Sequence, residues 1–138
     1  MKLIIYSDGG ARGNPGPAAT GVVIKNEKGE TMDAFGEYLG EQTNNFAEYS
    51  ALISGLKKAK ILGATEVECV LDSELVVKQM RREYKVKEPT LQKKFIEAYN
   101  ASIQLKKVTF RHTLREGNKE ADAILNKILD QAARQIRG

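Results

Sequence analysis

Alternating apolar and polar positions indicate that the first forty residues are mostly strands. Along residues 2–8, strict alternation and a high content of Ile predict a largely buried strand. Its two sides carry Leu3, Ile5 and Ser7, and Ile4, Tyr6 and Asp8. Residues 20–25 and 30–39 are also strand-like, and the polar segment 26–29 between them predicts a hairpin turn. Residues 9–17 contain four glycines and two prolines, so we expect neither helix nor strand there.

Two longer segments repeat apolar residues every three or four positions, as amphipathic helices do. Residues 43–62 form the first, and Gly63 supplies a stop signal. Its inward positions are Leu52, Gly55, Leu56, Ala59 and Leu62. Residues 118–136 form the second, for which Asn118 is the expected N-cap. Its apolar positions are Ala121, Ile124, Leu125, Ile128, Leu129, Ala132, Ala133 and Ile136.

The remaining segments complete an α/β pattern. Strands are predicted at residues 66–71 and 107–113, helices at 73–80 and near 91–105, and a loop at 84–89. The predicted order is therefore β-β-β-α-β-α-α-β-α. A hairpin meander followed by βαβ units predicts a mixed sheet with helices on its faces.

Composition narrows the class of protein. The chain has 138 residues, of which 41% are apolar and 29% are charged, and we expect one domain over residues 1–138. No segment has the length and apolarity of a membrane span, and residues 1–6 lack the layout of a signal peptide. Cys69, the single cysteine, lies in a predicted strand, so a disulfide framework is excluded. We therefore expect a cytoplasmic protein with Cys69 in its core.

Positive charge is concentrated in one segment. Residues 78–94 contain seven basic and two acidic residues, which gives this segment +5, whereas the whole chain carries +4. The basic residues are Lys78, Arg81, Arg82, Lys85, Lys87, Lys93 and Lys94. A solvated helix face is one explanation. The imbalance favours binding of a polyanion.

Four acidic residues stand at the ends of predicted elements. Asp8 and Asp72 each end an apolar strand, and adjacent parallel strands would place their carboxylates side by side. Glu48 and Asp122 lie in the first turns of two helices and border the apolar stripes. Taken singly, Glu48 fits a capping box with Asn45, and Asp122 complements a helix dipole. If the four carboxylates converge, they instead predict a divalent-metal site. Negative charges so close to one another repel, and bound cations would offset that repulsion.

The four acids in this order resemble those of type 1 ribonuclease H. The matching segments cover most of the chain and include its order of elements. They are Tyr6-Ser-Asp-Gly-Gly-Ala-Arg-Gly-Asn-Pro-Gly16, Thr43-Asn-Asn-Phe-Ala-Glu-Tyr49, Leu71-Asp-Ser73 and Arg115-Glu-Gly-Asn-Lys-Glu-Ala-Asp122.

This resemblance implies a five-stranded mixed sheet and endonucleolytic hydrolysis of the RNA strand of RNA–DNA hybrids, leaving 5′-phosphate and 3′-hydroxyl ends. It implies two Mg²⁺ ions, with Mn²⁺ as a substitute. We expect Asp8 to bridge the ions, Glu48 and Asp72 to bind one, and Asp122 to bind the other. A monomer is expected, and double-stranded RNA is a further candidate substrate.

The resemblance also implies substrate contacts by the backbone near Gly10 and Arg12 and by Asn14 and Asn45. The residues themselves add Gly9 in the glycine-rich segment, Ser73 and Arg115 as phosphate contacts, and Lys85 and Lys87 of the basic segment. Structural roles compete for three of them, since Asn14 suits a turn, Asn45 an N-cap, and Ser73 a cap after Asp72.

Two features depart from the familiar bacterial pattern of this family. His112, the single histidine, lies inside the last predicted strand, where we expect its ring to pack beside Val108 and Phe110. The loop before the last acid carries Arg115 in place of a histidine. The long Trp- and Lys-rich protrusion is also absent, and residues 80–87 are a shorter basic substitute with one aromatic, Tyr84.

Two other functions are compatible with such a fold. One is a non-catalytic module that binds hybrid or double-stranded RNA, which a missing carboxylate would have favoured. The other is a DNA nuclease or resolvase. The glycine-rich loop and the Asn14 and Asn45 pair favour recognition of an RNA strand, whose 2′-hydroxyls distinguish it from DNA.

Overall fold

The computed structural model describes residues 1–137, which contain five strands, four α-helices and one 3₁₀ turn in the predicted order. The strands are β1 (Lys2–Ala11), β2 (Gly16–Asn26), β3 (Thr31–Gln42), β4 (Glu66–Leu71) and β5 (Lys107–His112). The helices are α1 (Asn44–Ile61), α2 (Glu74–Met80), α3 (Pro89–Ser102) and α4 (Lys119–Arg137), and η1 (Arg115–Asn118) precedes α4. Gly138 and the side chains of Ile136 and Arg137 lie outside the described part.

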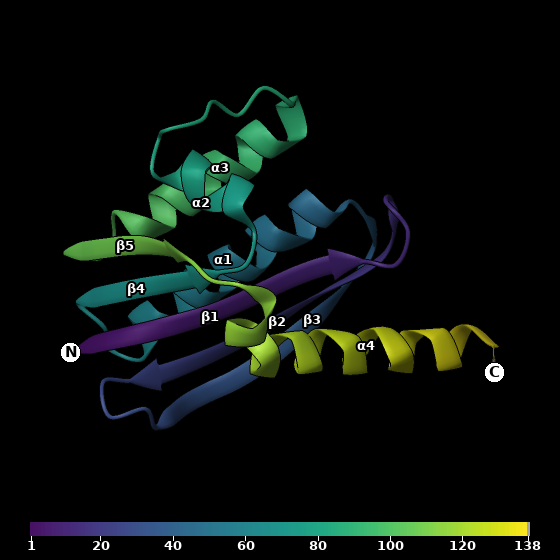
Figure 1. Cartoon of the computed structure of the whole chain (residues 1–138), viewed down its shortest axis with the longest axis horizontal. Coiled ribbons are helices and arrows are strands. Elements are labelled where there is room, and N and C mark those ends of the chain that lie inside the picture. The colour runs from purple at the N-terminus through teal and green to yellow at the C-terminus, as the bar shows by residue number, and fades with distance from the viewer. Residues whose placement is uncertain (138) are drawn as a thin grey trace.

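The strands form one mixed sheet in the order β3-β2-β1-β4-β5 (Figure 1). β1, β2 and β3 are an antiparallel meander, whereas β4 runs parallel to both β1 and β5. The predicted α/β class and mixed sheet are therefore confirmed. In the β1–β4 register Ser7 lies opposite Leu71, so Asp8 and Asp72 follow at neighbouring strand ends.

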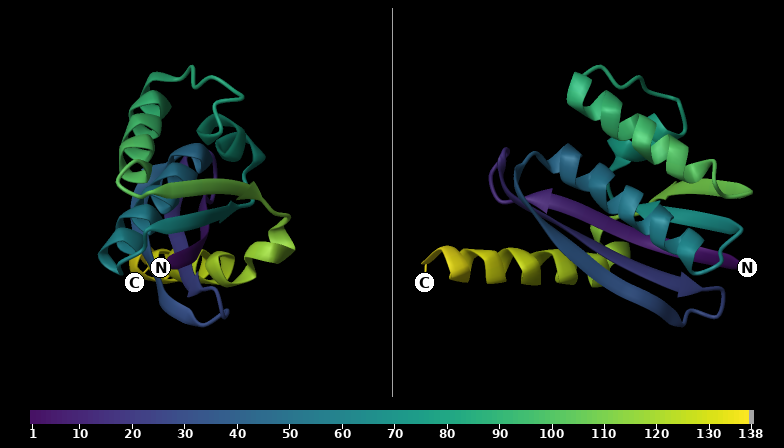
Figure 2. Two further views of the ribbon diagram at one scale, coloured as in Figure 1. Left: turned by 90° about the vertical axis from the view of Figure 1, so that its left-hand side faces the viewer. Right: turned by 180° about the vertical axis from the view of Figure 1, so that it is seen from behind.

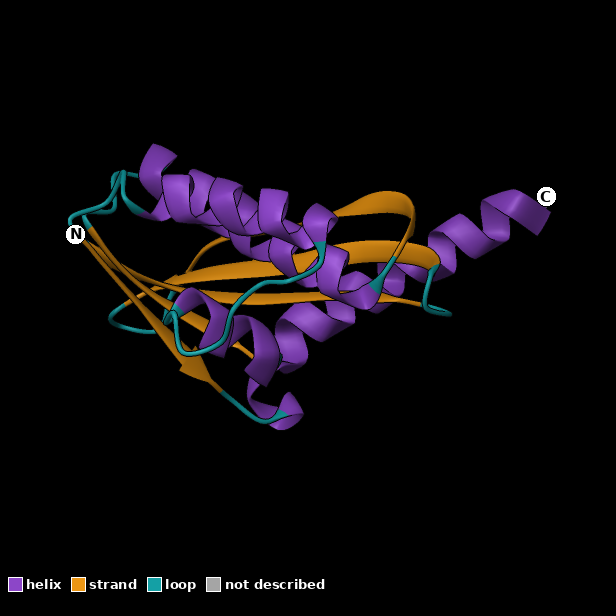
Figure 3. Cartoon of the chain, turned by 90° about the horizontal axis from the view of Figure 1, so that it is seen from above, coloured by secondary structure: helices purple, strands orange, loops and turns teal. Residues whose placement is uncertain are grey.

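Helices cover both faces of the sheet. In Figure 1, α4 lies in front of the meander, and Figure 2 shows α1 on the opposite side. Glycines allow both close contacts: a Cβ on Gly55 of α1 would lie 2.6 Å from the Ile5 side chain, and one on Gly21 of β2 would lie 2.0 Å from the Ala121 carbonyl oxygen of α4. Viewed from above, the end of α4 extends beyond the sheet (Figure 3).

The main core lies between the sheet and α1. Its fully buried side chains include Leu3, Ile5, Leu52 and Leu56, as the alternation and the helical stripe predict. Cys69 is also buried there, which confirms it as a core residue. Within residues 1–137, no helix has the length and apolarity needed to cross a membrane.

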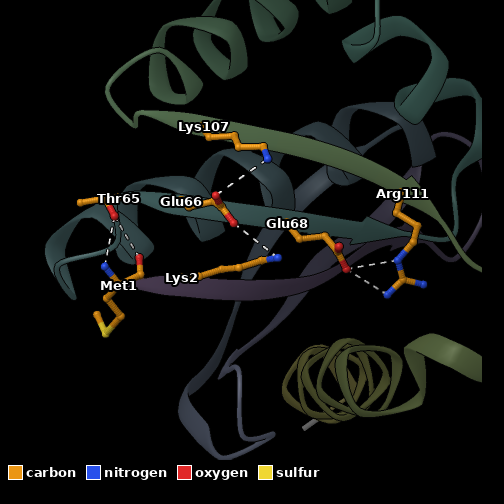
Figure 4. A network of polar contacts seen from close by, with 7 residues as sticks. All are labelled: Met1, Lys2, Thr65, Glu66, Glu68, Lys107 and Arg111. Carbon is orange, nitrogen blue, oxygen red and sulfur yellow. Dashed lines mark hydrogen bonds and ion pairs between the residues drawn. The ribbon is translucent and has the colours of Figure 1, made fainter.

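The part of the sheet that α4 leaves uncovered carries a ladder of charges (Figure 4). Glu66 of β4 lies between Lys2 at 3.4 Å and Lys107 at 4.0 Å, and Arg111 of β5 pairs with Glu68 at 3.2 Å. Such exposed pairs add little stability, but they keep this face polar.

The glycine-rich segment contradicts one prediction. Only residues 12–15 form a turn, because β1 continues through Gly9 and Gly10 to Ala11 and β2 already begins at Gly16. A Cβ on Gly9 would lie 2.1 Å from the Ala47 carbonyl oxygen, and one on Gly16 would lie 2.2 Å from the Arg12 carbonyl oxygen. These glycines therefore permit close backbone packing within the sheet, which composition cannot distinguish from a loop.

Helix starts also differ from the prediction in three places. The N-cap of α1 is Thr43, whose hydroxyl accepts from the Phe46 backbone N–H at 3.2 Å, so Asn45 is not the cap. α3 begins at Pro89, two residues early, because the Glu88 carboxylate caps it. Asn118 belongs to η1 and does not cap α4, since its side-chain oxygen has no hydrogen-bond partner.

Candidate metal centre

The first pair of carboxylates lies at two neighbouring parallel strands, β1 and β4. Asp8 lies within β1, one residue beyond the last β1–β4 pair, and Asp72 directly follows β4. Asp8 is 4% exposed, and Asp72 is half-buried. Their adjacency follows from the parallel register, as the sequence predicts.

Helix α1 adds Glu48 to the pair. Glu48 precedes Leu52 and Leu56 on the buried side of α1 and is itself 8% exposed. Because Gly9 has no side chain, the first turn of α1 lies directly against β1, and the Gly9 backbone N–H donates to the Glu48 carboxylate. Carboxylate oxygens of Asp8, Glu48 and Asp72 all lie within 4.8 Å of one another. Glu48 therefore joins the acidic cluster and does not close a capping box with Asn45.

Asp122 approaches from the opposite face of the sheet. It lies in the first turn of α4 and shares an open cleft of about 330 Å³ with Asp8 and Asp72. It is close enough to raise the pKa of Asp8, and the Arg115 guanidinium lies 3.5 Å from its Oδ1. All four predicted carboxylates are therefore brought together.

The cluster strongly disfavours its own ionisation. Burial, followed by the charges of Asp72 and Asp122, raises the pKa of Asp8 to about 8. Burial and the charges of Asp8 and Asp72 raise the pKa of Glu48 well above its usual range. The pKa of Asp72 is also raised, first by burial and then by the charge of Asp122. At neutral pH these groups therefore need protons or cations to offset their repulsion.

The donor set fits a hard divalent cation. Glu48 Oε2 and Asp72 Oδ1 are buried without any hydrogen-bond partner. Two buried acceptor oxygens are therefore available to bind a cation. Oxygen ligands on opposite sides of one Mg²⁺ lie about 4.2 Å apart, close to the spread of the cluster. The buried triad thus fits divalent-metal binding.

Hydrogen bonds tie the glycine-rich turn to α1 and α4. The Asn14 side-chain oxygen accepts from the Asn44 backbone N–H at 3.0 Å, and Asn44 Oδ1 accepts from the Ala11 N–H at 2.8 Å. The Arg12 guanidinium lies 2.7 Å from the Asp130 carboxylate on α4. The backbone N–H of Arg12 donates to the Pro17 carbonyl. Arg12 and Asn14 therefore hold this side of the cleft, which Gly9, Gly10 and Arg12 help to line.

Two other predicted contact residues lie close to the carboxylates in the chain. The Ser73 hydroxyl caps α2 by accepting from the Val76 N–H at 3.3 Å, directly after Asp72. Asn45 is half-buried in the first turn of α1, three residues before Glu48.

Several residues of the basic segment are held by the protein itself. Arg81 Nε donates to the Phe110 carbonyl at 2.9 Å, Lys78 lies 2.9 Å from Glu74, and Arg82 lies over the Tyr99 ring. Lys85 and Lys87 are exposed on the α2–α3 loop, and no carboxylate among the described residues lies within 4.0 Å of either. α2 has 7 residues, so this loop starts about 10 Å from Asp72.

His112 contradicts its predicted environment. It ends the edge strand β5 and is exposed, although Val108 and Phe110 on the same side are half-buried. Its charged neighbour is Glu74 at the start of α2. Arg115, in contrast, lines the cleft with Asp122, as its place in the loop suggested.

Two asparagines near the cleft have roles that sequence patterns did not reveal. Asn44 lines the cleft and links the glycine-rich turn to α1 through both its backbone and its side chain. Asn118 is 2% exposed, and its Nδ2 donates to the Ser7 carbonyl at 2.8 Å. The sequence did contain one indication of the role of Asn118. It lies four residues before Asp122, which places both residues on one helical face.

Comparison with known proteins is consistent with this site. The family model described as reverse transcriptase-like matches residues 6–128. A protein of Mycobacterium tuberculosis described as bifunctional is 42% identical over 134 residues, which are 96% of this chain and 37% of that protein. The chain thus spans little more than a third of the length of this relative.

Two solved structures are similar to this chain over almost their whole length. RNase H1 from the archaeon Halobacterium salinarum superimposes with a TM-score of 0.92 at 37% identity, covering 95% of this chain and 99% of that one. LC11-RNase H1, solved in complex with an RNA/DNA hybrid, superimposes with a TM-score of 0.91 at 48% identity, covering 95% and 99%.

Proposed function

Because the chain belongs to the ribonuclease H family, we propose that it is an enzyme that hydrolyses the RNA strand of RNA–DNA hybrids. The observation that carries this proposal is the convergence of Asp8, Glu48, Asp72 and Asp122, with two buried oxygens that lack partners. A module that only binds nucleic acid has no need of this cluster, whose mutual repulsion costs stability. The hybrid bound to LC11-RNase H1 supports the choice of substrate.

We assign the carboxylates to two Mg²⁺ ions, for which Mn²⁺ can substitute. Asp8 would bridge both, Glu48 and Asp72 would hold one, and Asp122 the other. When bound, such ions supply a water of lowered pKa and positive charge for the leaving 3′ oxygen, so products should carry 5′-phosphate and 3′-hydroxyl ends. No protein base is then required.

The other predicted residues would bind and orient the hybrid. Gly9 and Gly10 line the cleft without side chains, Gly10 being the more exposed, and this suits close approach to the minor groove, where 2′-hydroxyls identify RNA. Asn45 would contact sugars and bases, and Ser73 and Arg115 would contact the phosphate. Asn14 and Arg12 would act mainly by shaping the turn, and Lys85 and Lys87 would bind phosphates further along. We further propose that the enzyme is cytoplasmic and acts as a monomer.

One experiment separates the candidate functions. RNA–DNA hybrid, double-stranded RNA, double-stranded DNA and single strands are incubated with the protein in Mg²⁺, in Mn²⁺ and in chelator, and the products are sized and end-labelled. We expect internal cuts in the RNA of the hybrid, dependent on the metal. Binding without cutting would support the non-catalytic module, and cutting of DNA would support the nuclease or resolvase.

Arg115 should matter more than His112. Arg115 lines the cleft and lies 3.5 Å from Asp122, whereas His112 is not among the residues that line it. We expect His112→Gln to keep single-turnover cleavage within about tenfold of wild type, a barrier change of about 1.4 kcal/mol. Arg115→Ala should lose more than that. A large loss in the histidine variant alone, with folding intact, would reverse the two assignments.

Lys85 and Lys87 should set the salt dependence of hybrid binding. Because neither is paired within the described chain, each is available to a phosphate, and each loss should flatten the plot of log K against log salt by roughly one unit. The measurement is binding in chelator at several salt concentrations. Lys28→Ala is the control, because Lys28 is exposed in the β2–β3 turn, at the opposite end of β1 from Asp8. An unchanged slope in the double alanine variant would show that both lysines are merely solvated.

A further inference from the structure

The loop that leads into α4 is fastened at both ends beside the carboxylates. At its start, the Thr113 backbone N–H donates to the Leu71 carbonyl at 2.8 Å, directly before Asp72. At its end, Asn118 Nδ2 donates to the Ser7 carbonyl at 2.8 Å, directly before Asp8. Ser7 and Leu71 are partners in the β1–β4 register, so the two anchors lie side by side.

The second anchor depends on one side chain. Asn118 is 2% exposed and bonds across 111 residues of sequence to the backbone of β1. Asp122 follows one helical turn later, and Arg115 lies at the other end of the same 3₁₀ turn. A shift of Asn118 relative to β1 would therefore move both groups relative to Asp8.

From this arrangement we infer that Asn118 is a positioning residue, which holds Asp122 and Arg115 at the distance from Asp8 that metal binding and cleavage need. The part of this inference that concerns cleavage rests on the proposed function. Asn118 itself need not contact the substrate. Since misplacement by about 1 Å costs about a hundredfold in rate at many active sites, loss of the anchor should be felt mainly in turnover.

Loss of the anchor should leave α4 docked. Ala121 packs against Gly21, Leu125 and Leu129 are buried against β2, and Lys25 of β2 lies 2.7 Å from Glu120. These contacts are independent of the Asn118 side chain, so the variants should fold with α4 in place. What they lose is the hydrogen bond that ties the end of η1 to β1, directly before Asp8.

The test compares Asn118→Leu and Asn118→Ala with a matched control. Leu is close to isosteric but cannot donate, and Ala removes the bond without any risk of overpacking. Thr20→Val is the control, because Thr20 is 1% exposed and its hydroxyl makes a similar bond, accepting from the Glu37 backbone N–H at 3.0 Å. Each protein is measured for urea stability, Mn²⁺ affinity by electron paramagnetic resonance, hybrid affinity in chelator, and single-turnover cleavage.

We expect both Asn118 variants to cleave at least tenfold more slowly and to bind Mn²⁺ more weakly, with hybrid affinity in chelator within about twofold of wild type. Thr20→Val should lose comparable stability but keep cleavage and Mn²⁺ affinity. Asn118 variants that behave like the control in both would overturn the inference, as would losses confined to hybrid affinity. If wild type does not cleave hybrid, the proposed function fails, and Mn²⁺ affinity alone decides whether Asn118 positions the site.

Discussion

Asp8→Asn is expected to reduce cleavage of RNA–DNA hybrid by about a thousandfold or more while leaving the protein folded. Asp8 is the most central of the four acids, because Glu48, Asp72 and Asp122 all perturb its pKa. Asparagine keeps the size of the side chain but removes the charge that would hold divalent ions. A thousandfold loss corresponds to about 4 kcal/mol in the barrier, within what bound metal ions contribute to such reactions.

Single-turnover cleavage in saturating Mg²⁺ is the measurement, together with hybrid affinity in chelator. Asp72→Asn should behave in the same way, and hybrid affinity should stay close to wild type in both. Asp33→Asn is the matched control, because Asp33 lies on β3 and pairs only with Lys58 at 3.5 Å among the described residues. Near-normal turnover by Asp8→Asn or Asp72→Asn would refute the assignment of the carboxylates.

The sequence is most informative where local pattern and topology coincide. Two apolar strand segments that each lead into an Asp place Asp8 and Asp72 together once the strands pair in parallel, and β1 and β4 do pair in this way. Glu48 is equally predictable, because an acid on the same helical side as Leu52 and Leu56 faces the sheet. The sheet and the Asp8–Asp72 pair therefore follow from periodicity and order, whereas the local pattern of Asp122 fitted dipole complementation equally well and its place in the set rested on the resemblance.

The wrong predictions for Gly9, Gly10 and His112 share one cause. The burial of a segment depends on which other elements cover it. Gly9 and Gly10 have the composition of a loop, yet they lie in β1, because α1 approaches β1 too closely for a side chain on Gly9. His112 continues the alternation of Val108 and Phe110, but it ends an edge strand and is exposed. Neither outcome is written in the local sequence.

Counting charges does not show which basic residues have partners within the fold. Of the seven basic residues, the protein itself engages Arg81, Lys78 and Arg82. Asn118 shows the converse, because a residue expected to cap a helix instead bonds to a strand 111 residues away. Side-chain partners across the fold decide such roles, and they appear only once the topology has been built.

Without metal, the acidic cluster should make the protein less stable as pH rises from 5 to 8. The pKa of Asp8 is raised from 3.8 to about 8, so in this range the native state holds a proton that the unfolded state has released. Stability is then greatest at the acidic end and falls as pH rises toward 8. Each pH unit below the raised pKa costs about 1.4 kcal/mol, so the loss between pH 5 and 8 is at most about 4 kcal/mol.

Urea unfolding in chelator at several pH values between 5 and 8.5 measures this loss. Glu74 and Glu88, whose pKa values are lowered, change stability only below this range, because their charged forms are favoured in the native state. Asp8→Asn should flatten the slope and exceed wild type in stability at pH 8, whereas Asp33→Asn should keep the wild-type slope. Mg²⁺ or Mn²⁺ should restore wild-type stability at pH 8 and leave Asp8→Asn little changed. A pH-independent wild type, or an Asp8→Asn variant that stabilises no more than the control, would mean that these carboxylates do not repel one another in the folded chain.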